Sequence, residues 1–344
     1  MTDSSMIRQD SERSRAQVAT MKDDFTKFRK RLLLFLFAPC LLLLPWLPFG
    51  VLFGPQILER SKGPSAQAQT DHAFRNAKLR DYDLVFLGNS RVYRGINPDH
   101  MDVPSYNFAC DNDTYNQMYH KLKWLRETGK AFHHLVIGVD FFQFSFIASN
   151  RNHLYGPLLG DEYLADYPPD PNAKFRHWMK TWFRSLNPKY LFMPNNGRIF
   201  LRDNGQFIKP GVARATDTWE RSTKLLPVQI DYFERILADC RTHGTNVVLC
   251  MLPIRQAEKN CYTETQIEEF MEFLQNYVNN DVALIDLTFD DGYVMSDYTD
   301  ITHLNEAAAD RLSIQLNGLL MPILNADSST SHIPLASSDT TARQ

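Results

Sequence analysis

Two short segments carry side chains that can do nucleophilic chemistry together. Residues 88–91 read GNSR and follow an apolar run, and residues 300–303 read DITH and precede the last predicted helix. A serine hydroxyl becomes a nucleophile when a histidine within hydrogen-bond reach takes its proton. A carboxylate then fixes the tautomer of the histidine and stabilises its charged form. We therefore predict that Ser90, His303 and Asp300 form a catalytic triad.

Each segment taken alone has a plainer interpretation. A serine after a glycine often belongs to a turn or a helix cap, and Asp or Thr in front of a helix often caps it. The order along the chain favours chemistry, because the serine follows the first predicted strand, and the carboxylate and histidine follow the last one.

The elements that must position these residues alternate between strand and helix. Apolar runs predict strands at residues 84–87, 106–109, within 134–144, 245–252 and 282–286. Helical spacing predicts helices at residues 113–127, 223–243 and 305–320, and one that starts at the capping box of Thr263 and Gln266. This alternation predicts an α/β fold, with a doubly wound, mostly parallel sheet in a three-layer sandwich. In such sheets, ligands bind outside the carboxyl ends of the strands, where Ser90 stands.

Residues 146–220 interrupt this alternation. They are rich in prolines and aromatic residues and are too long for a simple loop, so we interpret them as an insertion or a lid over the site. Their aromatic side chains could stack on carbohydrate or could form a small core of their own. The aromatic residues are Tyr155, Tyr163, Tyr167, Phe175, Trp178, Trp182, Phe183 and Tyr190.

The stretch at residues 32–58 contains no charged residue and exceeds the roughly 20 apolar residues that span a bilayer as a helix. Several basic residues precede it, which predicts that the N-terminus is cytoplasmic and the rest of the chain is outside. A cleaved signal peptide is the alternative, since residues 66–68 (AQA) resemble a cleavage site. The apolar run is too long for a signal peptide and lies too far from that site. We therefore expect one N-terminal transmembrane helix inserted in the cytoplasmic membrane and a periplasmic or other extracytoplasmic domain.

These observations divide the chain into five parts. They are a disordered cytoplasmic N-terminus at 1–31, a transmembrane helix at 32–58, a linker at 59–79, an extracytoplasmic domain at 80–324 that contains the 146–220 insertion, and a disordered tail at 325–344.

Composition excludes some classes of partner. The 344 residues carry a formal net charge of −3, so the sequence gives no reason to expect nucleic-acid binding. The five cysteines are widely spaced without a CxxC pair, which argues against a zinc site. The spacing leaves open whether Cys261 forms a disulfide with either Cys240 or Cys250.

Four blocks of the sequence resemble the SGNH (GDSL-like) hydrolase superfamily. The similarity is to its membrane-anchored branch near the alginate O-acetyltransferases and the teichoic acid D-alanylation proteins, and it covers residues 80–145 and 225–324. The specific blocks are DLVFLGNSRVYRGINPDHM (83–101) and DITHLNEAAADRL (300–312), whereas YNFACDNDTYNQ (106–117) and LVIGVDFFQF (135–144) are weaker. The resemblance implies Ser90 as nucleophile, with Asp300 and His303 completing the triad.

The chain departs from the family at its second and third blocks. Asn112 stands where the family has a glycine whose N–H completes the oxyanion hole, and asparagine tolerates a left-handed backbone. Asp140 stands where the family has an asparagine donor, and an ionised aspartate only accepts hydrogen bonds. Either Arg91 or Asn112 donates instead, or Asp140 has a structural role such as pairing with Arg91 or Arg94.

We therefore predict an acyltransferase or esterase that acts on an extracytoplasmic polysaccharide or other envelope polymer, such as by O-acetylation, without a cofactor or metal. The resemblance also implies a polytopic membrane acyl-transfer protein as partner. Two alternatives stay open. One is a non-catalytic scaffold or carbohydrate-binding component of a polysaccharide assembly system, and the other is a plain esterase for small esters.

Overall fold

The structure is a computed structural model that describes residues 25–38, 44, 46–149, 151–185, 187, 189, 199–214, 222–326 and 336–337. The chain divides into two compact units. One comprises residues 1–58 and 177–193, and the other comprises residues 59–176 and 194–344.

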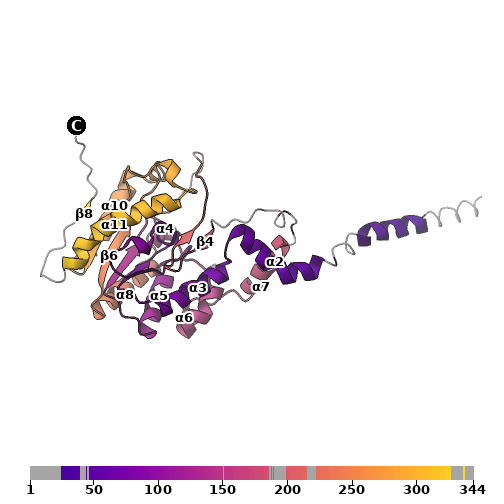
Figure 1. Cartoon of the computed structure of the whole chain (residues 1–344), viewed down its shortest axis with the longest axis horizontal. Helices are drawn as coiled ribbons and strands as arrows, with labels where there is room; N and C mark the ends of the chain where they lie inside the picture. Colours follow the sequence, from indigo (N-terminus) through magenta and orange to yellow (C-terminus); the bar gives the residue numbers. More distant parts are fainter. Residues whose placement is uncertain are drawn as a thin grey trace, which may run out of the picture. The chain divides into compact units, whose positions relative to one another are not determined.

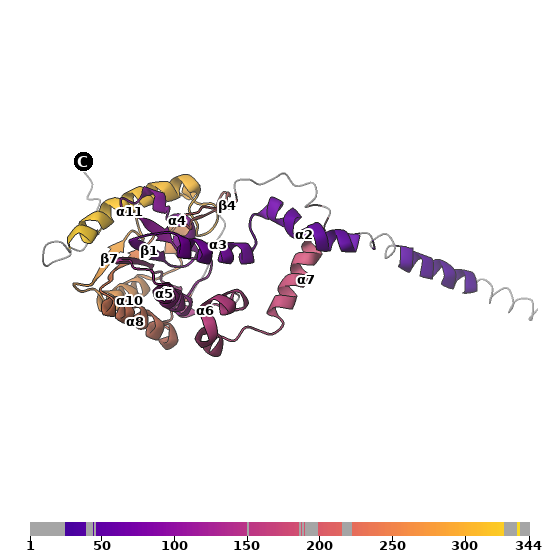
Figure 2. The ribbon, with the colours of Figure 1, turned by 60° about the horizontal axis from the view of Figure 1, so that its bottom comes forward.

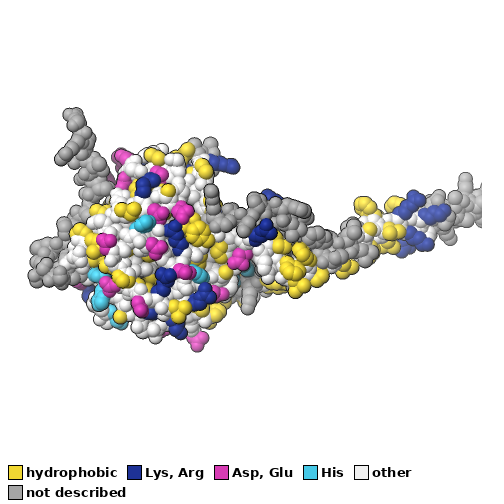
Figure 3. Space-filling model, in the orientation of Figure 1, with side chains coloured by type: hydrophobic (Ala, Val, Ile, Leu, Met, Phe, Trp, Pro, Cys, Tyr) yellow, Lys and Arg dark blue, Asp and Glu magenta, His cyan; other side chains and the backbone are white. Residues whose placement is uncertain are grey.

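The apolar N-terminal stretch is not one helix in the part of the chain that the structure describes. A helix covers residues 25–38, and α2 (Trp46–Lys62) is a second one. The sequence between them contains Pro39 and Pro45, and proline disfavours a helix interior. Within the described residues, every helix falls short of the combined length and apolar character that crossing a membrane requires. The predicted continuous helix at 32–58 is therefore not supported, although hydrophobic side chains are exposed along residues 25–38 (Figure 3).

The larger unit is built on a parallel sheet of five strands flanked by helices (Figure 1). Its spatial order is β2-β1-β3-β6-β7, and the two-residue strand β8 pairs in parallel beside β7. The strands are β1 (Leu84–Leu87), β2 (Ser105–Asn107), β3 (His134–Gly138), β6 (Asn246–Met251), β7 (Val282–Asp286) and β8 (Ala336–Ser337). The predicted strands are therefore present, with shorter bounds at most of them.

Helices cover both faces of this sheet, as the alternating sequence predicts (Figure 2). Successive side chains of β1 point to opposite faces: Val85 and Leu87 join one hydrophobic cluster, and Leu84 and Phe86 join the other. The first cluster includes α3 (Ala66–Leu79), α5 (Tyr115–Glu127), α6 (Asn152–Asp166), α8 (Pro227–Thr242) and α10 (Glu264–Gln275), and the second includes α4 (Ser90–Gly95) and α11 (Glu306–Ala326). The shorter helices are α9 (Gln256–Lys259), η1 (Pro98–His100), η2 (Gln143–Ser145) and η4 (Met295–Asp297).

The prediction of a linker at residues 59–79 is wrong. Helix α3 occupies most of this range, and Ser65 caps it by accepting a hydrogen bond from the Ala68 N–H. Its buried positions include Ala73, Phe74 and Ala77, which recur at helical spacing and join the core. Because most residues of this segment are polar, its narrow apolar face was hard to recognise from the sequence.

The predicted insertion at 146–220 is partly core. Tyr155 and Tyr163 of α6 are buried in the first cluster, so these two aromatic residues fill a core shared with the main sheet. The hairpin of β4 (Phe200–Leu201) and β5 (Phe207–Ile208) stacks Phe207 on Tyr93 of α4 at 5.4 Å between ring centroids. Helix α7 (Ala173–Ser185) differs, because Phe175, Trp178 and Phe183 are exposed. Residue Tyr190 lies outside the described residues.

The bounds predicted for the two ends of the chain also need correction. Helix α11 continues to Ala326 and so includes the start of the tail predicted at 325–344. Apart from β8, the rest of that tail lies outside the described residues, as do residues 1–24 of the predicted N-terminal segment. The described cysteines 110, 240, 250 and 261 are all free thiols, so the structure contains neither of the two disulfides left open above.

A buried lysine fixes the turn between β2 and α5. The Lys121 ammonium donates to the Phe108 carbonyl at 2.9 Å and to the Asp113 carboxylate at 2.5 Å. Tyr155 donates to the same carboxylate at 2.7 Å, and the Lys121 and Asp113 side chains are each 1% exposed. A buried carboxylate needs such partners because water cannot solvate it.

We predict that Lys121→Met lowers the free energy of unfolding by about 3–5 kcal/mol, because it leaves the buried Asp113 carboxylate without its cationic partner. Urea denaturation followed by circular dichroism measures this change. The double variant Lys121→Met/Asp113→Leu should be more stable than the single variant, since both charges are then removed. A single variant as stable as the unmodified protein would contradict this account of the turn.

Candidate active site

The nucleophile candidate Ser90 stands at the first position of α4, directly after the β1 turn. A Cβ atom at Gly88 would lie 2.4 Å from a Val92 methyl group, so this position accepts only glycine without a shift. Asn89 caps α4 by accepting a hydrogen bond from the Arg91 N–H at 2.8 Å. Together these contacts present the partly buried Ser90 side chain at the carboxyl edge of the sheet.

The base candidate His303 stands in a tight loop in front of α11. The Asp300 carboxylate accepts the backbone N–H groups of Thr302 and His303, each at 3.1 Å. The Thr299 N–H donates to the His303 carbonyl at 2.8 Å, and Asn305 accepts the Ala308 N–H at the start of the helix. The local hydrogen bonds that make Asp300 a turn residue therefore also direct its carboxylate toward the imidazole.

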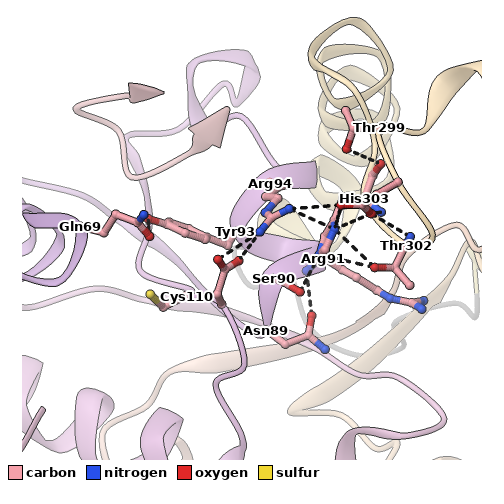
Figure 4. A network of polar contacts seen from close by, with 12 residues as sticks. Gln69, Asn89, Ser90, Arg91, Tyr93, Arg94, Cys110, Thr299, Thr302 and His303 are labelled. Carbon is pink, nitrogen blue, oxygen red and sulfur yellow. Dashed lines mark hydrogen bonds and ion pairs between the residues drawn. The ribbon is translucent and has the colours of Figure 1, made fainter. Parts of the chain in front are cut away.

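The structure brings Ser90, His303 and Asp300 into one hydrogen-bonded chain. His303 Nε2 lies 2.7 Å from Ser90 Oγ, and His303 Nδ1 lies 2.7 Å and 2.9 Å from the two Asp300 carboxylate oxygens. Because the carboxylate can only accept, Nδ1 carries the proton and Nε2 is free to accept from the serine hydroxyl. Figure 4 shows Ser90 on α4 facing His303 from the opposite loop.

The electrostatics of the site keep His303 neutral and Asp300 ionised. Burial lowers the pKa of His303 below its ordinary value of 6.5; the hydrogen bond to Asp300 opposes this effect and the charge of Arg94 adds to it. Burial would raise the pKa of Asp300, but its hydrogen bond with His303 and the charge of Arg94 hold that pKa well below its ordinary value. A neutral imidazole is the form that can take a proton from serine.

Arg94 borders the imidazole and was not assigned this place from the sequence. Its guanidinium donates to both oxygens of Asp111 at 2.9 Å and 3.0 Å and lies 3.6 Å from Asp300. It also lies 3.1 Å from His303 Nδ1, where two donors face each other, so this contact is electrostatic rather than a hydrogen bond. The sequence held one signal: Ser90 and Arg94 are four residues apart and share a face of α4.

The turn after β2 contains Asn112. The Cys110 N–H donates to the Gly88 carbonyl at 3.3 Å, which ties this turn to the one that carries Ser90. Asn112 has a φ of 62°, a left-handed backbone that asparagine tolerates better than most residues. Among the described residues, neither the Ser90 N–H nor the Asn112 N–H meets a hydrogen-bond acceptor. Both can therefore donate to an anion.

Arg91 and Asp140 pair with each other. An Arg91 nitrogen lies 3.0 Å from the Asp140 carboxylate, and a second one contacts Glu258. The side chains of Arg91 and Asp140 are 4% and 7% exposed, and Asn89 donates to Asp140 at 2.6 Å. Of the roles considered for Asp140, pairing with Arg91 is the one present, and the Arg91 guanidinium is engaged by carboxylates.

A cavity of about 380 Å³ opens beyond the carboxyl ends of β6 and β7. Its walls come from the two segments that follow these strands, 254–259 and 289–295, and the second runs on toward the loop of Asp300 and His303. Volumes of a few hundred Å³ suit small ligands.

The fold and this site define an α/β protein with a serine–histidine–aspartate arrangement at the carboxyl edge of a parallel sheet. No protein-family model matches the chain, and no curated protein matches it. Among solved structures the chain is similar to a "putative platelet activating factor from Streptococcus pneumonia", with 15% sequence identity and a TM-score of 0.37. That match covers 82% of this chain and 98% of the other. A likeness at this level carries no argument about function, which rests on the geometry above.

We predict that the rate at which a fluorophosphonate labels Ser90 falls at low pH with a midpoint below 6.5, because only neutral His303 can take the serine proton. In Arg94→Ala the midpoint should rise, since a positive charge is lost and the Asp111 carboxylate, which raises the pKa of His303, then keeps only the more distant Arg151, at 3.8 Å, as a cationic partner among the described residues. Arg94→Lys, which keeps the charge, should shift it less. An unmodified protein with a midpoint above 6.5, or an Arg94→Ala variant with an unchanged one, would contradict these electrostatics.

Proposed function

We propose that this chain is a serine acyltransferase or esterase of the SGNH type that acts on an extracytoplasmic polysaccharide or other envelope polymer. The observation that carries the proposal is the continuous chain of contacts of 2.7 Å from Ser90 Oγ through His303 to Asp300. It joins two loops that are 213 residues apart in sequence, which a pair of helix caps would not require.

In the proposed reaction, Ser90 Oγ attacks the carbonyl carbon of an acyl ester while His303 Nε2 takes the hydroxyl proton. The negative charge that develops on the carbonyl oxygen is held by the N–H groups of Ser90 and Asn112. The tetrahedral intermediate then collapses, and His303 returns the proton to the departing alcohol. This leaves an ester between the acyl group and Ser90.

In the second half, a sugar hydroxyl or water attacks this ester while His303 again takes the proton. The new bond forms to the acyl carbon, the bond to Ser90 Oγ breaks, and the serine regains its proton. Asp300 stabilises the imidazolium in both halves, and Arg94 opposes it. The residues need no metal or cofactor for these steps.

The polymer and the membrane setting come from the sequence. The resemblance implies an envelope glycan as substrate and a polytopic membrane protein as acyl donor. The uncharged stretch at 32–58, its basic flank and the exposed hydrophobic side chains at 25–38 support attachment to the cytoplasmic membrane with the larger unit outside. Recovery of the full chain in the soluble fraction of lysed cells would count against this part of the proposal.

We predict that a serine-directed fluorophosphonate labels the full chain on Ser90 and that Ser90→Ala abolishes labelling, as intact-mass and peptide mass spectrometry would show. His303→Ala should slow labelling by a factor on the order of 10⁴ or more, because the proton then has no acceptor. Ser105→Ala is the matched control, since the Ser105 hydroxyl donates to the nearby Val103 carbonyl and contacts no triad residue among those the structure describes. This variant should leave labelling unchanged.

The alternative function is a non-catalytic carbohydrate-binding or assembly component. The exposed aromatic residues of α7 favour it, with Trp178 51% and Phe183 61% exposed, because stacking on sugar rings uses such surfaces. A chain that resists the fluorophosphonate but loses glycan binding in Phe183→Ala would favour this alternative. Rapid turnover of a p-nitrophenyl ester would instead indicate a plain esterase.

A further inference from the structure

One short segment after β6 contacts the turn that carries Ser90 and the loop that carries His303, through the residues next to the triad. This segment, residues 255–259, comprises Arg255 and helix α9, and we call it the bridging segment.

The first contact is with the residue next to the serine. Glu258 of α9 pairs with the guanidinium of Arg91, the residue next to Ser90, and the two side chains are 2% and 4% exposed. Burial lowers the pKa of Arg91, but the charges of Asp140 and Glu258 outweigh it and hold that pKa above its ordinary value. Arg91 therefore stays charged, and a buried charge between two carboxylates has little freedom to move.

The second contact is with the loop that carries the histidine. Arg255 Nε donates to the Ile301 carbonyl at 2.6 Å, and Ile301 lies between Asp300 and His303. A second nitrogen of Arg255 donates to the Arg214 carbonyl at 3.3 Å, and Arg255 is 4% exposed. A guanidinium held on a backbone carbonyl fixes the loop itself and not only one of its side chains.

The topology explains why such a connection is needed. Ser90 follows β1 and the His303 loop follows β7, while β3 and β6 lie between these strands. Three strand spacings amount to roughly 14 Å, so the sheet alone leaves the two loops well apart. The bridging segment follows β6, one of the two intervening strands, and reaches outward to both sides.

We propose that Arg255 and Glu258 are positioning residues, which hold the His303 loop and the Ser90 turn at hydrogen-bond distance by linking both to one segment. The inference rests on the proposed function, because alignment matters for rate only if Ser90 reacts. Neither residue touches Ser90 or His303 in the structure. Their loss acts through geometry, and displacements of about 1 Å at a reacting centre cost up to about 100-fold in rate.

The test compares Arg255→Met and Glu258→Ala in the full chain, with Arg255→Lys and Glu258→Gln as conservative variants. We expect the fluorophosphonate labelling rate of Ser90 to fall about 10–100-fold in the first two and to recover in part in the conservative variants. Proton NMR gives a readout that does not depend on reactivity. The strongly downfield signal of the His303 proton on Nδ1 should broaden or vanish in Arg255→Met.

Two controls separate positioning from lost stability. Asn260→Ala changes the exposed residue that ends α9 and should leave labelling and the NMR signal unchanged. Leu320 is a residue of α11 that is buried in the hydrophobic core, so Leu320→Ala creates a cavity there. This variant should lower thermal stability while leaving the labelling rate and the NMR signal unchanged. If Arg255→Met or Glu258→Ala unfolds, the conservative variants are measured alone and should still label more slowly than Leu320→Ala.

The inference is overturned if folded Arg255→Met and Glu258→Ala label Ser90 at the unmodified rate and keep the downfield signal. It is equally overturned if Leu320→Ala loses as much labelling as they do. Failure of the proposed function would look different: the unmodified chain would not label at all. In that case the downfield signal still decides whether the bridging segment aligns the His303 loop.

Discussion

The site depends on a contact between two loops that the parallel sheet by itself keeps apart. The chain carries Ser90 at the end of β1 and His303 beyond β7, with two other strands between them. A hydrogen bond of 2.7 Å between these residues is sensitive to small shifts of either loop. The surrounding structure therefore has to fix both loops, and buried charges account for much of that fixation.

Buried ion pairs surround the site on several sides. Lys121 and Asp113 hold the turn of Asn112, and Arg91 stands between Asp140 and Glu258. Such pairs contribute little net stability compared with apolar packing, but breaking one is costly because it leaves a charge without water or a partner. Moving either loop would separate these charges from their partners and would therefore cost free energy. This cost keeps the serine and the histidine aligned.

Sequence patterns were sufficient to predict the layered fold and the loops that meet at the sheet edge, because strands buried on both faces read as apolar runs. The linker at 59–79 was mispredicted because α3 buries a narrow face within a polar segment. The parts played by Arg94, Arg255 and Glu258 depend on contacts between distant segments, and no local pattern encodes these. The sequence left two partners open for Asp140, Arg91 and Arg94, and its pairing with Arg91 likewise depends on a contact between distant segments.

The central claim is that Ser90 forms a covalent acyl intermediate with the help of His303. It is tested most directly by mixing the full chain with an activated acyl ester, quenching in acid within seconds and mapping the modified peptide by mass spectrometry. The account predicts that the peptide containing Ser90 gains the mass of the acyl group, and that His303→Ala does not accumulate it. Ester turnover with acyl groups on other residues, and none on Ser90, would contradict the account.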